Sequence, residues 1–210
     1  MLVTYSPIII PGPAGQLEAL ISAPDTQEST AVGIICHPHP LYGGAMNNKV
    51  VTTIARTFHE LGLHTVRFNF RGVGKSEGSY AEGIGETEDL RAVSAWARKN
   101  YPNQPIWLAG FSFGSYVAMR IAAAEEVAQL ITIAPAVNHV NFGDADQVRC
   151  PWLLIMGEAD EIVPVADVKA WVKKLSVPVR CVFLPGVSHF FHGHLGLLSE
   201  ELKRNLPKRN

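Results

Sequence analysis

The chain lacks a long hydrophobic run and lacks an excess of charge of either sign. Of its 210 residues 47% are hydrophobic, yet the best apolar stretches, residues 31–36 and 152–156, are only as long as a strand. A membrane-spanning helix needs about 20 consecutive apolar residues. Eighteen Lys and Arg are balanced by nineteen Asp and Glu, so no basic field could hold a nucleic-acid backbone. We therefore expect no membrane and no nucleic-acid partner.

Cysteine is also scarce. Cys36, Cys150 and Cys181 are an odd number and have no close spacing, which does not fit a disulfide framework. The first residues carry no basic segment ahead of an apolar stretch, and prolines interrupt residues 7–13, so we expect no secretory signal. These features together predict reduced cysteines in a cytoplasmic protein.

Strand-like and helix-like segments alternate along the chain. Residues 3–10 and 16–22 flank a stretch rich in Pro and Gly and predict an antiparallel hairpin. Six further strand-like runs are separated by segments long enough for crossover helices, a pattern typical of parallel sheets. The expected strands are 30–36, 64–70, 106–109, 129–134, 152–156 and 180–184, and the expected helices are 48–61, 86–99, 115–125, 165–175 and 195–206.

This alternation predicts an α/β fold. We expect a mostly parallel sheet of about eight strands, with the hairpin at its start and helices on both faces. No linker, repeat or low-complexity tract divides the chain, so residues 1–210 are expected to form a single domain.

Two serines fit the pattern Gly-x-Ser-x-Gly, in which small flanking residues let a strained serine stand above a sheet. Ser112 lies between the expected strand 106–109 and the expected helix 115–125, and a helix N-terminus helps to hold negative charge. Ser76 is followed instead by a loop interrupted by glycines. The residues before Ser76 also resemble the end of a phosphate-binding loop, but Asn69 stands where that motif has glycine. We expect Ser112 to be a nucleophile.

A serine hydroxyl is a weak nucleophile unless a base takes its proton and a third group orients that base. Asp160 and His189 each follow a strand-like run, at the sheet edge where sites form. The order Ser, Asp, His along the chain fits this architecture. Asp144 and Asp146, in the loop after residues 129–134, are alternative positions for the acid.

Five motifs in order along the chain resemble the α/β-hydrolases, particularly the small, nearly lidless bacterial type with a His-Pro-His-Pro-Leu-Tyr-Gly-Gly stretch. The resemblance covers nearly the whole sequence. It implies a catalytic triad of Ser112, Asp160 and His189 and a fold with a minimal cap or none. The motifs are residues 37–44, 67–74, 110–114, 157–160 and 189–191.

An oxyanion hole needs two N–H donors close to the developing negative oxygen. The Phe113 N–H is expected to be one, and the second normally comes from the loop after the third strand. In that loop Pro38 stands where glycine is usual, and proline has no N–H. The His39 backbone is therefore the favoured second donor, with Leu41 as the alternative.

Further residues are assigned from their place in the expected loops. His37, Leu41, Tyr42 and Asn138 are candidate substrate-binding residues. Only about fifteen residues connect the strands 129–134 and 152–156, so we expect an open, shallow site. Four other side chains are expected to act in packing or bracing: Asn69, Arg71, Phe190 and Phe191.

Five of the eight histidines fall in loops expected above the sheet, which raises the question of a metal site. His189, His192 and His194 lack the i, i+4 spacing of a helical zinc motif, and no carboxylate or cysteine cluster joins them. We expect no metal and no cofactor.

The function expected from these residues is hydrolysis of a small carboxylic ester or related acyl bond through an acyl-enzyme at Ser112. An acyltransferase or a peptidase would use the same residues, and a binding protein could use the same scaffold without catalysis. The partner is then a small-molecule acyl substrate. The sequence leaves the oligomeric state open.

Overall fold

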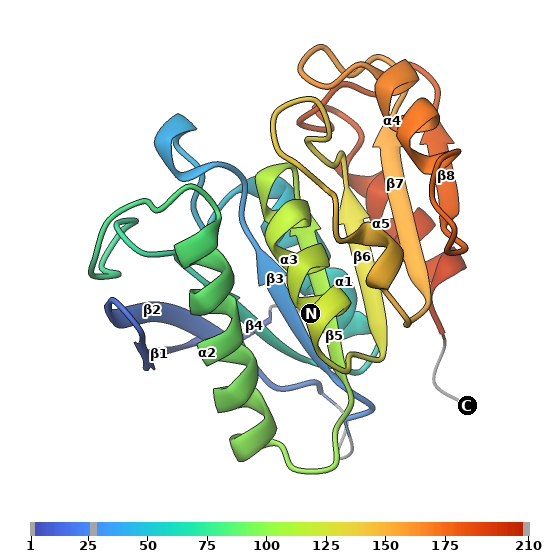
Figure 1. Ribbon diagram of the computed structural model, residues 1–210. Helices are drawn as coiled ribbons and strands as arrows, with labels where there is room; N and C mark the ends of the chain where they lie inside the picture. The colour runs from blue at the N-terminus through green and yellow to red at the C-terminus, as the bar shows by residue number, and fades with distance from the viewer. Residues whose placement is uncertain (1–2, 26–28, 208–210) are drawn as a thin grey trace.

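A computed structural model describes residues 3–25 and 29–207. They form one sheet in the order β1-β2-β4-β3-β5-β6-β7-β8 (Figure 1). β3 to β8 run parallel, and β2 is antiparallel to β1 and β4. The strands are β1 (Ser6–Gly12), β2 (Gly15–Ser22), β3 (Val32–Cys36), β4 (His64–Phe68), β5 (Ile106–Phe111), β6 (Gln129–Ile133), β7 (Trp152–Gly157) and β8 (Arg180–Leu184).

Helices cover both faces of the sheet, which confirms the α/β fold expected from the sequence. α1 and α5 pack on one face, and α2, α3 and α4 lie over the other (Figure 1). Successive residues of a strand point to opposite faces, so Leu108 of β5 joins the core under α2 and α3 while Ala109 joins the core under α1 and α5. The helices are α1 (Lys49–Glu60), α2 (Ile84–Asn100), α3 (Phe113–Ala124), α4 (Val165–Val172) and α5 (Leu195–Asn205).

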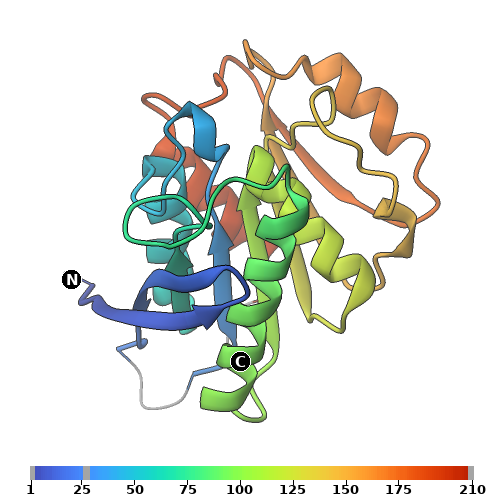
Figure 2. The same ribbon diagram turned by 60° about the vertical axis from the view of Figure 1, so that its left-hand side comes forward.

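The opening hairpin turns more tightly than the sequence pattern predicts. β1 continues through Pro11, which pairs with Gln16, so only two residues connect the strands. Proline is tolerated there because β1 is the edge strand of the sheet, where a missing N–H costs no ladder bond. Gly15 has a φ of 122°, which suits a residue without Cβ. The hairpin lies beside α2 (Figure 2).

Other boundaries move by a few residues. β4 ends at Phe68 rather than residue 70, and β5 continues to Phe111 rather than ending at residue 109. The added length of β5 arises because Phe111 still pairs with Ile133 of β6. As a result, α3 begins only two residues after β5, so the turn between them is sharp.

The carboxyl ends of the six parallel strands meet at one edge of the sheet, where the loops that follow them gather (Figure 1). The connection between β6 and β7 contains one short 3₁₀ helix, Ala145–Gln147, as its only helical element. The expected absence of a large cap after β6 is therefore confirmed. No helix within the described residues is long and apolar enough to cross a bilayer.

Candidate active site

Ser112 occupies the sharp turn between β5 and α3 with φ 53° and ψ −116°. This left-handed conformation is strained for a residue with a side chain and is typical of a nucleophile elbow. The flanking glycines make the turn possible. A Cβ on Gly110 would lie 2.1 Å from the Gly114 carbonyl oxygen, and one on Gly114 would lie 2.4 Å from the Cys36 oxygen.

Asp160 and His189 meet in a short hydrogen bond of 2.7 Å between Asp160 Oδ2 and His189 Nδ1. The Asp160 side chain is completely buried, and its second oxygen accepts the N–H groups of Ile162 at 2.9 Å and Val163 at 2.8 Å. Glu161, which the sequence analysis did not single out, accepts the His189 backbone N–H at 3.0 Å. These bonds fix both the carboxylate and the imidazole in place.

Ser112 and His189 line the same pocket. Among the described residues, no hydrogen bond joins the Ser112 hydroxyl to His189 Nε2, and such contacts are commonly long in ligand-free sites. The structure thus brings the three expected residues to one place, with Nδ1 of the imidazole engaged by the carboxylate and Nε2 without a hydrogen-bond partner among the described residues.

The competing serine has a structural role. Ser76 is buried, and its hydroxyl donates to the Asn69 carbonyl oxygen at 2.7 Å while accepting the Glu18 N–H at 2.9 Å. Its two bonds tie the loop after β4 to β2. Ser76 does not line the pocket of Ser112.

The alternative acids also lie elsewhere. Asp144 has a side chain that is 65% exposed and lies 3.9 Å from Arg120. Asp146 accepts both the N–H and the hydroxyl of Ser176, and these bonds lower the pKa of Asp146. Neither carboxylate contacts His189, whereas Asp160 bonds its imidazole.

The loop after β3 engages the Leu41 N–H but not that of His39. His39 caps the short 3₁₀ helix Pro40–Tyr42, and its Nδ1 accepts the Leu41 N–H at 3.2 Å. The His39 N–H has no acceptor among the described residues, and neither has that of Phe113 at the start of α3. Burial lowers the pKa of His39, with Glu86 opposing this shift, so its ring is neutral at neutral pH.

The expectation that His37 binds substrate is corrected by its burial. The side chain is completely enclosed and does not line the pocket. Its Nδ1 bonds the Pro38 carbonyl oxygen at 2.7 Å, and its Nε2 accepts the Phe70 N–H at 3.0 Å. Burial lowers the pKa of His37 to about 4. His37 therefore joins the ends of β3 and β4 and cannot reach a ligand.

The pocket over Ser112 has a volume of about 560 Å³. Of the remaining substrate-binding candidates, Tyr42 lines it. Leu41 is 67% exposed and lies outside the lining, and Asn138 donates instead to the Ile162 carbonyl oxygen at 3.3 Å. His139 and Val140, from the loop expected at the rim, also line the pocket, and the lining residues that were not predicted as ligand contacts include Asn48, Tyr80, Ala136, Ile162 and Phe190.

Phe190 and Phe191 lie in different environments. Phe191 is completely buried in the core under α1 and α5, as expected. Phe190 packs on Phe111 and His189, and it is also 37% exposed and lines the pocket. The positive φ of Phe191, 54°, turns the chain between the two rings.

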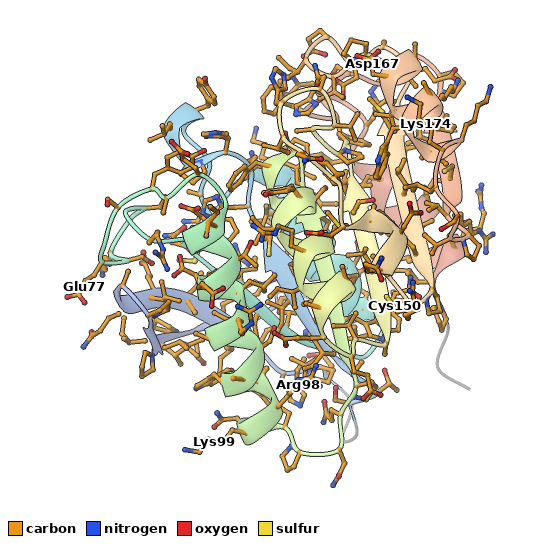
Figure 3. The ribbon with its side chains drawn as sticks, in the orientation of Figure 1. Glu77, Arg98, Lys99, Cys150, Asp167 and Lys174 are labelled. Carbon is orange, nitrogen blue, oxygen red and sulfur yellow. The ribbon has the colours of Figure 1, made fainter. Side chains whose placement is uncertain are left out.

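Tyr80 reaches the pocket because the long loop between β4 and α2 is held at several points. Arg71 forms an ion pair of 2.7 Å with the completely buried Asp89, and Asn69 accepts the Met46 N–H at 2.8 Å, so both brace the turn as expected. Glu77, labelled in Figure 3 on this loop, accepts the Gln16 N–H at 2.7 Å.

Within the described residues, no group of three or more His, Cys, Asp or Glu side chains is placed to hold a metal ion. Of the two remaining loop histidines, His194 bonds the His192 carbonyl oxygen at 2.9 Å through its Nδ1. Nothing in the site geometry calls for a metal to position Ser112 or His189.

Comparisons with known proteins show the family to which the chain belongs. The family model described as serine aminopeptidase, S33, matches residues 29–142. An uncharacterized protein of Rickettsia prowazekii is 35% identical over 190 residues, which cover 86% of this chain and 79% of that protein.

Two solved structures are similar over essentially the whole chain. An α/β serine hydrolase homologue from Coxiella burnetii is 53% identical, with a TM-score of 0.94 and coverage of 99% of this chain and 100% of that one. An α/β serine hydrolase without a lid from Xanthomonas campestris is 43% identical, with a TM-score of 0.91 and coverage of 100% and 99%. The chain belongs to the α/β-hydrolases, and within them to the small type that has no lid.

Proposed function

We propose that the protein is a serine hydrolase that cleaves a small carboxylic ester, with Ser112 as nucleophile, His189 as base and Asp160 as the group that orients the base. The observation that carries this proposal is the Asp160–His189 hydrogen bond of 2.7 Å in the pocket that holds the strained Ser112. Each of the three residues follows a parallel strand at the same sheet edge.

In the proposed reaction the Ser112 hydroxyl oxygen attacks the ester carbonyl carbon while His189 Nε2 takes its proton. The tetrahedral intermediate collapses, and His189 returns the proton to the departing alcohol oxygen. Water then attacks the acyl-enzyme and gives a proton to His189, which returns it to Ser112 Oγ as the carboxylic acid leaves. Asp160 keeps the proton of the neutral imidazole on Nδ1, so that Nε2 can accept.

We assign the stabilisation of the developing oxyanion to hydrogen bonds from the N–H groups of Phe113 and His39. Phe113 begins α3, so its N–H has no acceptor within the helix and lies at the positive end of the helix dipole. Pro38 has no N–H, and the Leu41 N–H is already engaged by His39 Nδ1. These facts favour His39 over Leu41 as the second donor.

The pocket composition supports an ester over a peptide N-terminus. An aminopeptidase must bind a positively charged amino group, and a buried charge needs a partner. No Asp or Glu is among the described residues that line the pocket. Hydrolysis is favoured over acyl transfer because the short connection after β6 leaves no cap that could exclude water.

Labelling with a fluorophosphonate tests the nucleophile. Wild-type protein should gain one covalent adduct by intact mass and hydrolyse a nitrophenyl ester, and Ser112→Ala should lose both properties. Ser76→Ala is the matched control, because it removes a hydroxyl from the same motif outside the pocket, and it should keep both. Labelling that persists in Ser112→Ala would refute the assignment.

We also propose a cytoplasmic location. The three cysteines are free: Cys36 is buried, and Cys181 is part-buried in β8. Cys150 lies just before β7, at the edge where the parallel strands begin (Figure 3). Free thiols persist in reducing compartments. Localisation of a fluorescent fusion at native expression level would test this proposal.

A further inference from the structure

The pocket at Ser112 has two unlike walls. One wall comes from the segment after β3 and the loop after β4, and its side chains are aromatic or polar: His39, Tyr42, Asn48 and Tyr80. The opposite wall comes from the loops after β6, β7 and β8 and is apolar apart from one imidazole: Ala136, His139, Val140, Ile162 and Phe190. Because β5, which leads into Ser112, lies between β3 and β6 in the sheet, an ester attacked by Ser112 meets both walls.

Fixed charge is missing from both walls. None of the described residues that line the pocket is Asp, Glu, Lys or Arg. An ionised substrate group would lose hydration on entering without gaining an ion pair. The lining therefore favours a substrate that is uncharged on both sides of its scissile bond.

The Tyr80 hydroxyl is free to donate a hydrogen bond to a ligand. His39 Nδ1 accepts the Leu41 N–H, so the proton of the neutral ring is on Nε2. Nε2 then donates to the Tyr80 oxygen at 3.2 Å, which leaves the Tyr80 proton without a protein acceptor in this pair. Burial, together with the Glu86 and Glu82 carboxylates, raises the pKa of Tyr80, so the hydroxyl keeps its proton at neutral pH.

Asn48 offers a second neutral donor on the same wall. Its Oδ1 accepts the Val50 N–H at 2.9 Å and caps α1. Its amide nitrogen has no acceptor among the described residues, although the side chain lines the pocket. Tyr42, 86% exposed, adds an aromatic ring at the mouth, 4.8 Å from the His39 ring. Neutral donors beside an aromatic ring suit hydroxyl-rich groups, whose oxygens accept and whose C–H faces pack on the ring.

Building on the proposed esterase function, we propose that the substrate is an uncharged ester with a hydroxyl-rich portion and a small apolar portion. The hydroxyl-rich portion is held by Tyr80, Asn48 and Tyr42, and the apolar portion packs on the wall formed by Val140, Ile162 and Phe190. The hydroxyl groups can belong to the alcohol, as in an acetylated glycoside or glycerol, or to the acid, as in a hydroxy-acid ester.

Initial rates measured in a pH-stat test this specificity. The substrates are monoacetylated methyl glucoside, glycerol monoacetate, ethyl glycerate and ethyl acetate, with acetylated glycerol 3-phosphate and acetylcholine as charged esters. We expect kcat/KM for at least one hydroxylated neutral ester to exceed that for ethyl acetate by about tenfold or more. Both charged esters should fall at least about tenfold below glycerol monoacetate.

Two conservative variants assign the effect to the polar wall. Tyr80→Phe keeps the ring, and Asn48→Ser keeps an oxygen that can cap α1. Each should raise KM for the hydroxylated ester and lower its kcat/KM about five- to tenfold more than it lowers kcat/KM for nitrophenyl acetate. Tyr101→Phe, at a tyrosine stacked on His64 outside the pocket, is the matched control and should change neither rate.

Binding to Ser112→Ala separates this inference from the proposed chemistry. That variant should bind acetylated methyl glucoside in a saturation-transfer NMR experiment, and adding Tyr80→Phe should weaken the binding. If the wild type neither turns over esters nor reacts with fluorophosphonate but binding persists, the proposed function fails and the assigned ligand class stands. Equal rates for ethyl acetate and every hydroxylated ester, or equal losses on all substrates in Tyr80→Phe, would overturn the specificity assigned here.

Discussion

At the scale of single residues, the Asp160 carboxylate makes three hydrogen bonds within the site. One of its oxygens bonds the His189 ring, and the other accepts two backbone N–H groups from its own loop. Full burial of the carboxylate means that removing its charge leaves those donors less well satisfied. Among the described residues, Asp160 is the carboxylate that bonds the His189 ring, whereas Asp144 and Asp146 are engaged elsewhere.

Asp160→Asn should therefore lower kcat by several powers of ten. The expected size is about 10⁴-fold by analogy with the equivalent change in a serine protease, where the wrong imidazole tautomer is stabilised. Asp144→Asn is the control and should stay within about twofold of the wild type. The measurement is kcat on a nitrophenyl ester, and near-normal turnover by Asp160→Asn would contradict the assignment.

His37 should make the folded state sensitive to mild acid. Burial lowers its pKa in the folded protein from 6.5 to about 4, so the unfolded chain takes up a proton first as the pH falls. The contribution of His37 to the free energy of unfolding is then fully present above pH 6.5. It is lost as the pH falls toward 4, a decrease of about 3 kcal/mol. Urea unfolding of wild type and His37→Gln at pH 7, 6 and 5 measures this effect. The variant should show the shallower decline, and parallel curves would refute the prediction.

At the scale of elements, the β5–α3 turn is the most constrained feature. β5 and α3 approach so closely that a Cβ on Gly110 would lie 2.1 Å from the Gly114 carbonyl oxygen, and α3 lies so close to the end of β3 that a Cβ on Gly114 would lie 2.4 Å from the Cys36 oxygen. Backbone atoms cannot rotate away as a side chain can. The two glycines therefore hold Ser112 in its position as much as the serine's own conformation does.

Gly110→Ala should separate β5 from α3, with a loss of at least about 2 kcal/mol in the free energy of unfolding. Turnover should fall about 100-fold, because displacement of Ser112 by about 1 Å removes its alignment with His189. Gly196→Ala is the matched control: its added Cβ would meet nothing within 4 Å, and it should gain up to about 1 kcal/mol in helix α5. Urea unfolding and kcat measured on both variants would decide; normal turnover by Gly110→Ala would contradict the close-packing argument.

At the scale of the whole molecule, the missing cap sets how much of a substrate can be buried. The connection from β6 to β7 has a single short 3₁₀ helix, and the pocket holds about 560 Å³. With no cap above the pocket, a long acyl chain would stay in contact with water along its outer side. Burial of each methylene is worth about 0.8 kcal/mol, and methylenes outside the pocket gain little of it.

Short acyl esters should accordingly be hydrolysed at least as well as long ones, without activation at a lipid interface. The measurement is kcat/KM for nitrophenyl esters of increasing acyl length at fixed pH. We expect no steady rise beyond eight carbons. A rise of about threefold or more per added methylene beyond that length would reveal an apolar tunnel and contradict the open-site interpretation.

The sequence by itself determined the sheet, the helices and the three residues that meet at its edge. Strand and helix patterns have short periods, and the glycines around Ser112 act within a few residues of it. Asp160 and His189 were found because each directly follows a strand, and parallel strands end at the same edge. Such inferences require only local pattern and chain order.

Tertiary structure alone decided the edge position of Pro11, the burial of His37 and the access of Tyr80 to the pocket. Each depends on contacts between segments far apart in the chain: the Ser76 hydroxyl accepts the Glu18 N–H across 58 residues, and His37 accepts the Phe70 N–H across 33. In loops, the sequence has no repeating hydrophobic pattern from which the direction of a side chain could be predicted. Their place is settled only when distant polar groups satisfy one another in the packed molecule.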